Sequence, residues 1–216
     1  MLEKMDIFFE SRLADYDEHM LKTIEGAEEF YKFTASQLPM EPKSEILDLG
    51  CGTGLELEEY FSLNPSAHIT GIDLSAAMLN ALVKKFPDKA LRLIRGSYFE
   101  VPFGYNGYAA AVSVESLHHF TEKQKISLYQ RLFHALTADG YFILTDYFAE
   151  TKSQEKEYFN KLEKLKQAQN ITDHDIYHYD TPLTVEHEME ILKSAGFSEV
   201  KMLKNWGATY TLKAIR

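Results

Sequence analysis

Three glycines at alternate positions follow a short apolar run that contains an acid. The segment EILDLGCGTG, residues 45–54, places Gly50, Gly52 and Gly54 just after Asp48. Glycines permit a tight turn and let a ligand approach the main chain without a Cβ in the way. Backbone N–H groups at the start of a following helix would then face a polar group of that ligand. The pattern predicts a binding turn, although glycine-rich turns also serve phosphates, dinucleotides and purely structural roles.

A second acid ends the next apolar segment. Asp73 follows Asp48 by 25 residues, which is the length of one β-α-β unit. Both acids are therefore expected at the same edge of a parallel sheet, where ligands bind in open α/β folds. A dinucleotide fingerprint requires Gly-x-Gly-x-x-Gly, and the alternating glycines here depart from that spacing. The spacing thus disfavours a nicotinamide-dependent dehydrogenase.

Two adjacent histidines, His118 and His119, follow the apolar segment 109–114. Their position after a predicted strand places them at the same sheet edge. Because the unperturbed pKa of histidine is about 6.5, either side chain is a candidate general base. The alternative for each is a role in packing or in bracing the loop.

A second group of titratable residues occupies the segment 173–180, DHDIYHYD. His174 and His178 are four residues apart, so on a helix they would share a face and could bind a metal ion. The alternation of residue types fits an extended chain equally well, and no cysteine accompanies them. We therefore expect no metal here and interpret the segment as a substrate lid rich in hydrogen-bonding rings.

The elements that position these residues alternate along the chain. Strands are predicted at residues 45–49, 68–73, 91–95, 109–114 and 141–146, with helices from the glycine turn to about 63, at 75–86 and at 122–136. Such alternation implies parallel β-α-β units in a three-layer sandwich. Apolar spacing in residues 1–38 predicts two further helices that pack onto this core.

The rest of the chain interrupts and then completes the alternation. Residues 150–181 read as an insertion with an amphipathic helix at 153–169, and a last helix follows at 184–195. Two final strands, at 199–204 and 209–214, would pair as a hairpin. We predict an α/β fold, a three-layer α-β-α sandwich whose seven-stranded, mostly parallel sheet has an antiparallel C-terminal hairpin strand. It forms a single domain over 1–216, in which 1–40 is a helical cover and 150–181 a substrate lid.

The composition restricts the partners. The 216 residues are 45% hydrophobic with a formal net charge of −10, which argues against nonspecific binding of nucleic acid, although a local basic groove is compatible with it. The single cysteine, Cys51, cannot form an intramolecular disulfide, and the N-terminal residues lack the apolar core of a signal peptide. No run reaches the roughly 18 apolar residues of a membrane span. We expect a soluble cytoplasmic protein, and the sequence does not predict its oligomeric state.

Two segments resemble motifs of a known family. Residues 45–54 resemble the first motif of the class I S-adenosylmethionine-dependent methyltransferases, the seven-stranded Rossmann-like family. Thr-Gly-Ile-Asp-Leu-Ser at 70–75, with Met78 behind it, resembles the second motif. The resemblance covers roughly residues 40–150. It implies a methyltransferase whose cofactor is S-adenosylmethionine.

The resemblance also implies which residues contact the cofactor: Asp48, Gly50, Cys51, Gly52, Gly54, Asp73, Leu74, Met78, Ser97, Tyr98 and Val114. Asp73 would accept both ribose hydroxyls in charge-assisted hydrogen bonds, and Asp48 would meet the methionyl amino group. Ser97 stands where many relatives carry an acid for the adenine amino group. The alternatives are a bracing role for Asp48, a helix cap for Asp73, and core packing for Leu74 and Met78.

Methyl transfer by this family requires mainly alignment of the reactants and exclusion of water. We predict His118 or His119 as the base, with Tyr16, Tyr147 and His178 as substrate contacts, although Tyr16 is equally compatible with core packing. The acidic chain favours a small-molecule acceptor. The alternatives are methylation of a tRNA or rRNA base, and a protein that binds S-adenosylmethionine without catalysis.

Overall fold

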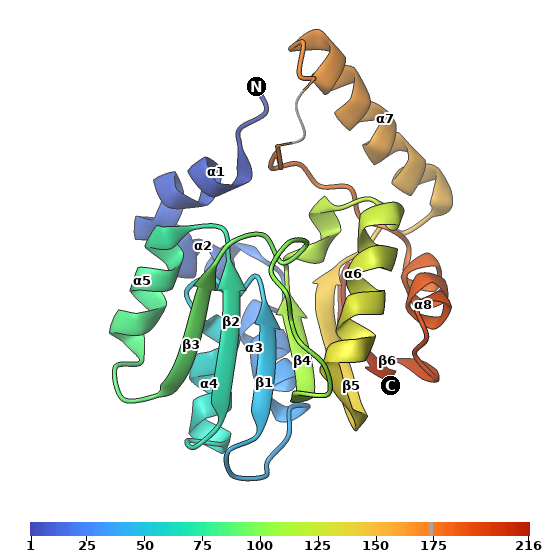
Figure 1. Ribbon diagram of the computed structural model, residues 1–216. Coiled ribbons are helices and arrows are strands. Elements are labelled where there is room, and N and C mark those ends of the chain that lie inside the picture. The colour runs from blue at the N-terminus through green and yellow to red at the C-terminus, as the bar shows by residue number, and fades with distance from the viewer. Residues whose placement is uncertain (173–174) are drawn as a thin grey trace.

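The computed structural model describes residues 1–172 and 175–216, and its centre is one twisted sheet (Figure 1). Within these residues the sheet has seven strands in the order β3-β2-β1-β4-β5-β7-β6. The strands are β1 (Glu45–Leu49), β2 (His68–Asp73), β3 (Ala90–Arg95), β4 (Tyr108–Val114), β5 (Leu136–Tyr147), β6 (Glu199–Trp206) and β7 (Thr209–Ile215). The first five run parallel, and β7 pairs antiparallel with both β5 and β6. The predicted α/β sandwich with an antiparallel C-terminal hairpin is confirmed.

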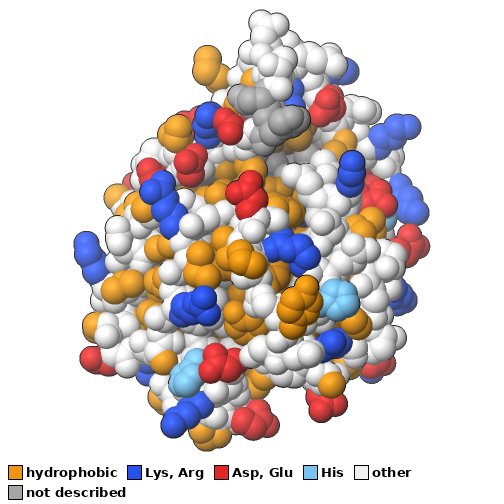
Figure 2. All heavy atoms as spheres, in the orientation of Figure 1, with side chains coloured by type: hydrophobic (Ala, Val, Ile, Leu, Met, Phe, Trp, Pro, Cys, Tyr) orange, Lys and Arg blue, Asp and Glu red, His pale blue; other side chains and the backbone are white. Residues whose placement is uncertain are grey.

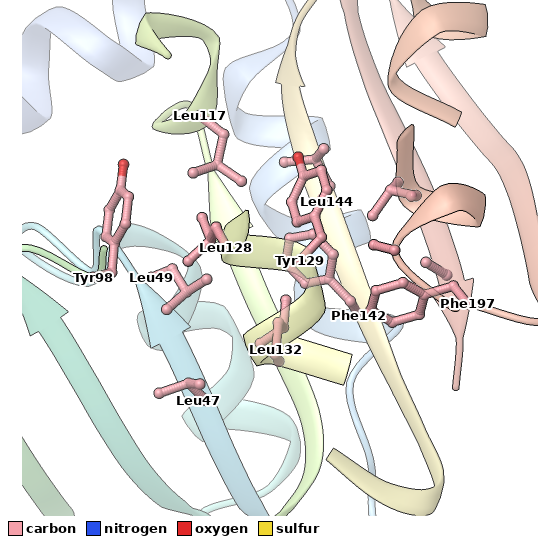
Figure 3. Close-up of a cluster of buried hydrophobic side chains, with 14 of the residues drawn as sticks. Leu47, Leu49, Tyr98, Leu117, Leu128, Tyr129, Leu132, Phe142, Leu144 and Phe197 are labelled. Carbon is pink, nitrogen blue, oxygen red and sulfur yellow. The ribbon is translucent and has the colours of Figure 1, made fainter. Parts of the chain in front are cut away.

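Helices cover both faces of the sheet (Figure 1). They are α1 (Met5–Arg12), α2 (Tyr16–Thr23), α3 (Ala27–Ser36), α4 (Leu55–Leu63), α5 (Ala76–Lys85), α6 (Glu122–Ala135), α7 (Lys152–Ala168) and α8 (Val185–Ser194). One core cluster joins the sheet to α3, α4 and α5, and the other joins it to α6 and α8. Figure 3 shows the second cluster, in which Leu128 and Leu132 of α6 pack near Leu47 and Leu49 of β1. Alternation along the strands explains the two clusters, because successive side chains point to opposite faces.

The prediction of two N-terminal helices is wrong. The described residues of this region contain α1, a 3₁₀ turn at Leu13–Asp15, α2 and α3. Gly26 separates α2 from α3 in the left-handed conformation, with φ of 74°. A Cβ on Gly26 would lie 2.6 Å from the Cβ of Trp206, so a residue far along the chain fixes this break. Apolar spacing alone did not reveal it.

The connection between β3 and β4 is a loop, residues 96–107, and it leaves part of the sheet open. A groove of 530 Å³ lies beside β3 and is lined in part by Leu91, Phe103 and Tyr105. Figure 2 shows hydrophobic side chains gathered over the middle of the same face, with charged side chains around them. Among the described residues, no helix is long and apolar enough to cross a membrane.

A capping box at Thr121 starts α6, the helix that follows the two histidines. The Thr121 hydroxyl accepts a hydrogen bond from the Gln124 amide, and the Gln124 side chain accepts one from the Thr121 amide. We expect Thr121→Ala to lower the free energy of unfolding by about 1 kcal/mol in urea denaturation, because one N–H at the helix start loses its acceptor. Lys123→Ala in the same turn is the control. Equal stability of the two variants would contradict a stabilising cap.

Candidate functional site

The glycine turn lies between the carboxyl end of β1 and the start of α4. Gly50 has a φ of 77°, which favours glycine. A Cβ on Gly50 would also lie 2.2 Å from the Ser116 hydroxyl, in the loop after β4. Glycine is therefore required at position 50 both by the backbone conformation and by the close approach of two loops.

Asp73 ends β2 and faces this turn. Its carboxylate accepts hydrogen bonds from the Gly52 amide at 2.9 Å and the Ser75 amide at 2.8 Å. Burial raises the pKa of Asp73, and the backbone donors oppose that rise. The N-cap of α5 is Ser75, whose hydroxyl accepts from the Met78 amide. The alternative of Asp73 as the helix N-cap is therefore wrong.

A cavity lies over the turn, and we call it the glycine-turn cavity. It is lined by Met5, Phe9, Tyr16, Gly50, Gly52, Asp73, Leu74, Met78, Tyr98, Val114, Glu115, Ser116 and His119. Its free volume is 50 Å³, because side chains of α1 and α2 approach the turn from above. A ligand of nucleoside size needs more room than the side chains of Met5, Phe9 and Tyr16 leave here.

Seven of the predicted cofactor residues line this cavity: Gly50, Gly52, Asp73, Leu74, Met78, Tyr98 and Val114. Four others, Asp48, Cys51, Gly54 and Ser97, lie outside its lining as the structure describes it. The Cys51 sulfur points to Gly71, where a Cβ would lie 2.8 Å from it, and Gly54 faces Leu82 and Phe86. The Ser97 hydroxyl accepts from the Phe99 amide. Their predicted cofactor contacts stay predictions.

Asp48 lies beneath the turn, next to Glu56 of α4. Both side chains are buried, and Asp48 Oδ2 and Glu56 Oε1 have no hydrogen-bond partner among the described residues. Burial raises the pKa of Asp48 well above its usual range, and the charge of Glu56 raises it further. Burial also raises the pKa of Glu56. Burial therefore disfavours the charged form of Asp48, which suits the bracing role.

A second, larger cavity of 700 Å³ adjoins the first, and we call it the histidine cavity. Its lining comprises Phe8, Phe9, Ser11, Arg12, Asp15, Tyr16, His19, Met20, Ile24, Glu115, His118, His119, Tyr147, His178, Asp180 and Thr209. Four residues, Phe9, Tyr16, Glu115 and His119, line both cavities. The two cavities thus share a boundary between the carboxyl end of β4 and the helices α1 and α2.

His118 is held from below by a buried carboxylate. Its Nδ1 lies 2.5 Å from Oδ1 of Asp146, whose other oxygen accepts a hydrogen bond from the Leu117 amide. Burial opposes protonation of His118, but the charge of Asp146 and this hydrogen bond outweigh it and raise its pKa to about 9. His118 is therefore a cation at neutral pH.

His119 differs from His118 in its charge. Its ring centre lies 4.0 Å from that of His118, and its Nδ1 lies 3.2 Å from both Asp180 Oδ1 and the Tyr179 carbonyl oxygen. Burial and the charge of His118 lower the pKa of His119. Burial would raise the pKa of Asp180, but the hydrogen bond to His119 and the charge of His118 lower it overall. His119 is a neutral imidazole paired with a carboxylate.

The three predicted substrate residues line the histidine cavity. The His178 ring stacks on Phe8 at 3.5 Å, and burial lowers its pKa to about 4. The Tyr147 hydroxyl lies 2.9 Å from that of Tyr158 in α7, and Tyr16 lines both cavities. His178 lies in extended chain, which removes the helical basis for pairing it with His174. Asp173 and His174 lie outside the described residues.

The cover over both cavities is built from two distant segments. The Met5 amide donates to the Ile176 carbonyl, and the His178 amide donates to the Glu3 carbonyl. An isolated antiparallel bridge joins Lys4 to Tyr177. The N-terminal segment and the end of the insertion therefore meet above the carboxyl ends of the strands (Figure 1).

Two further acids at this edge of the sheet, Glu115 and Asp146, were not predicted as site residues. Glu115 follows β4 with a φ of 47° and accepts a hydrogen bond from the Thr209 hydroxyl, and burial raises its pKa to about 7. Asp146 lies at the end of β5. The rule that singled out Asp48 and Asp73, an acid at the carboxyl end of a parallel strand, would have found both.

Comparison with known proteins indicates the family. The family model described as a methyltransferase domain matches residues 46–140, which contain the glycine turn, Asp73 and the two histidines. This match and the similarities to known proteins support a class I S-adenosylmethionine-dependent methyltransferase. The cofactor of this methyltransferase is S-adenosylmethionine.

Individual relatives are distant. The methyltransferase is 25% identical to a carboxy-S-adenosyl-L-methionine synthase of Nitratiruptor over 81% of this chain and 77% of that protein. It is also 25% identical to the (+)-O-methylkolavelool synthase of Herpetosiphon aurantiacus, over 83% of this chain and 59% of that protein. Human N-acetylserotonin methyltransferase in complex with S-adenosylmethionine has a similar fold, with a TM-score of 0.67 and 16% identity over 96% of this chain and 56% of that one. The methyltransferase thus spans less than two thirds of two of these three relatives.

The lining of the glycine-turn cavity fits this cofactor. Asp73 offers a carboxylate to hydroxyl groups, while the amides of Gly50, Cys51, Gly52 and Gly54 donate within the protein and hold the turn in shape. Leu74, Met78 and Tyr98 provide apolar surface for a flat base. The chemical character of this lining therefore matches the groups of the cofactor.

Arg131 of α6 fixes the loop that carries Tyr98. Its guanidinium donates to the carbonyl oxygens of Tyr98 at 3.0 Å, Phe99 at 2.6 Å and Val101. We expect Arg131→Ala to lower the free energy of unfolding by about 1 to 2 kcal/mol in urea denaturation, because these carbonyls lose their donor. The neighbouring exposed residue gives the control Gln130→Ala. If Arg131→Ala changed the free energy of unfolding no more than the control does, the loop would be stable without the Arg131 hydrogen bonds.

Proposed function

We propose that the protein transfers a methyl group from S-adenosylmethionine to a small-molecule acceptor bound in the histidine cavity. The observation that carries this proposal is the adjacency of the two cavities, which share Phe9, Tyr16, Glu115 and His119. A cofactor in one cavity and an acceptor in the other would meet at this shared wall. Holding two reactants in contact supplies a large part of the acceleration in such reactions.

The bound cofactor supplies an electrophilic methyl group, so the residues of the chain have three tasks. Asp73 and the glycine turn orient the nucleoside end of the ligand. Glu115 lies at the shared wall, where its carboxylate form would stabilise positive charge. Phe8 and Phe9 of α1 exclude water once the cover has closed, which prevents side reactions.

We assign removal of the acceptor's proton to the pair His118 and His119. His119 is neutral at pH 7 and can accept the proton there, whereas His118, whose pKa is about 9, can accept it only above that pH. Both lie at the wall between the cavities or next to it, and each is held by its own carboxylate, Asp146 or Asp180. Tyr147 and His178, whose rings lie next to those of His118 and His119, would orient the acceptor. These roles extend the sequence-based prediction of a histidine base to the pair.

A small molecule is favoured over RNA for two reasons. The chain carries a net charge of −10, whereas phosphate binding requires concentrated positive charge. The cavity is enclosed by α1 and α2 and has a volume of 700 Å³, which suits a small ligand. The names of two relatives, a carboxy-S-adenosyl-L-methionine synthase and an O-methylkolavelool synthase, also refer to small molecules.

The test is production of S-adenosylhomocysteine from S-adenosylmethionine on a panel of metabolites. Turnover with at least one small molecule supports the proposal. Tight cofactor binding without turnover on any acceptor would favour a protein that binds S-adenosylmethionine without catalysis. Filter binding of tRNA at low and high salt addresses the RNA alternative, for which tight and salt-sensitive binding is expected. A cytoplasmic location remains part of the proposal.

A further inference from the structure

Three potential metal ligands meet at the floor of the histidine cavity. Asp180 Oδ1 lies 3.7 Å from His118 Nε2 and 3.2 Å from His119 Nδ1. One ligand atom from each of these residues lies within 4.8 Å of the others. Ligand atoms about 2.0 to 2.1 Å from a tetrahedral Zn²⁺ are roughly 3.3 Å apart, so this spacing is close to what an ion requires. Small side-chain shifts would complete the geometry.

The support around His118 has the form found behind metal-bound histidines. Its Nδ1 lies 2.5 Å from Asp146 Oδ1, and Asp146 is 1% exposed. With Nδ1 bonded to a carboxylate, Nε2 is left to face Asp180. A carboxylate that holds the second ring nitrogen fixes both the orientation and the tautomer of a ligating histidine.

The local charge favours a cation. Glu115 and Asp146 lie within 4.8 Å of His118 by their ligand atoms, and Asp180 lies on the other side of that ring. Three carboxyl groups therefore surround two imidazoles. A divalent ion between the imidazoles and Asp180 would neutralise the excess negative charge of these carboxyl groups. It would also replace the proton between each imidazole and Asp180.

We propose that His118, His119 and Asp180 bind a divalent first-row transition metal ion such as Zn²⁺, with its open positions toward the histidine cavity. Two imidazoles and one carboxylate suit such ions. The catalytic use of the ion rests on the proposed function. In that case His118 and His119 act by holding the ion and not as bases themselves. An acceptor O–H, N–H or S–H bound to the ion loses its proton to solvent more readily. The acceptor lone pair then forms the bond to carbon, and the electrons of the carbon–sulfur bond remain on sulfur.

The test is a titration of the full chain, freed of metal by chelation, with Co²⁺ alone. We expect one equivalent to bind and to give the visible absorption of a four- or five-coordinate site. His118→Asn, His119→Asn and Asp180→Asn should each weaken binding at least about tenfold, and Asp146→Asn about 10- to 100-fold. His178→Ala, which removes the next imidazole in the cavity, is the control for metal binding. Circular dichroism of each variant establishes that it is folded.

Two results would overturn the metal site. One is the absence of stoichiometric binding by the folded wild-type chain, and the other is binding that the three ligand variants leave unchanged. The readout needs no methyl acceptor, so it is independent of the metabolite panel. Turnover that survives chelation, together with a failed titration, would refute the ion and retain the methyltransferase.

Discussion

Replacing His118 by asparagine is expected to lower kcat for S-adenosylhomocysteine formation by about 10²- to 10⁴-fold when measured above pH 9, where His118 has lost its proton and can act as a base. His118 lines the histidine cavity but is absent from the described lining of the glycine-turn cavity. Affinity for S-adenosylhomocysteine should therefore change by less than roughly threefold, since the variant removes an interaction with the acceptor. Single-turnover kinetics and calorimetry measure the two quantities separately.

The matched control is His134→Asn on α6. His134 is an exposed histidine whose ring contacts Phe133 and Tyr105, away from both cavities. It should leave kcat and cofactor affinity unchanged. If His118→Asn retained full turnover, proton removal would not involve this residue, and its pairing with Asp146 would be purely structural.

Replacing Asp73 by alanine should weaken binding of S-adenosylmethionine by about 1.5 to 3 kcal/mol, or roughly 10- to 150-fold, because charge-assisted hydrogen bonds to the ligand are lost. The same carboxylate accepts from the amides of Gly52 and Ser75, so the turn loses part of its support as well. Asp73→Asn keeps an acceptor oxygen but loses the charge. Its affinity should lie between those of the wild type and the alanine variant.

Calorimetric titration with S-adenosylhomocysteine measures this effect without need of an acceptor. Glu58→Gln is the control, because Glu58 is an exposed acid of α4 that pairs only with Lys85 among the described contacts. Unchanged affinity of Asp73→Ala would place the nucleoside end of the ligand somewhere other than beside β2. The assignment of the glycine-turn cavity would then fail.

Local patterns predicted most of the fold. Strands and helices are specified by apolar periodicity over 5 to 15 residues or so, and the turn at 50–54 by glycine spacing. β1, β2 and the positions of Asp48 and Asp73 follow from such local signals. The predicted element boundaries are wrong where a residue distant in sequence packs against the chain, as Trp206 does at Gly26. β5 also starts at Leu136, five residues before the predicted strand.

The candidate site was predicted only in part. The family resemblance identified the cofactor, and the sheet-edge rule singled out His118 and His119. The charge states of these histidines were beyond the sequence, because they depend on Asp146 and Asp180, which are distant in sequence and adjacent only in the fold. The same is true of the distinction between Tyr98, which lines the glycine-turn cavity, and Ser97, which is turned into its own loop.

The amino-acid sequence by itself determined the sheet, the glycine turn and the two acids that end β1 and β2, since each depends on residues that are neighbours along the chain. Only the tertiary structure decided that two cavities share a wall and that two histidines carry different charges. It also brought residues 3–5 against 176–178 as their cover. Electrostatic and packing effects act through space, and the folding of β4, β5 and the insertion sets the distances over which they act.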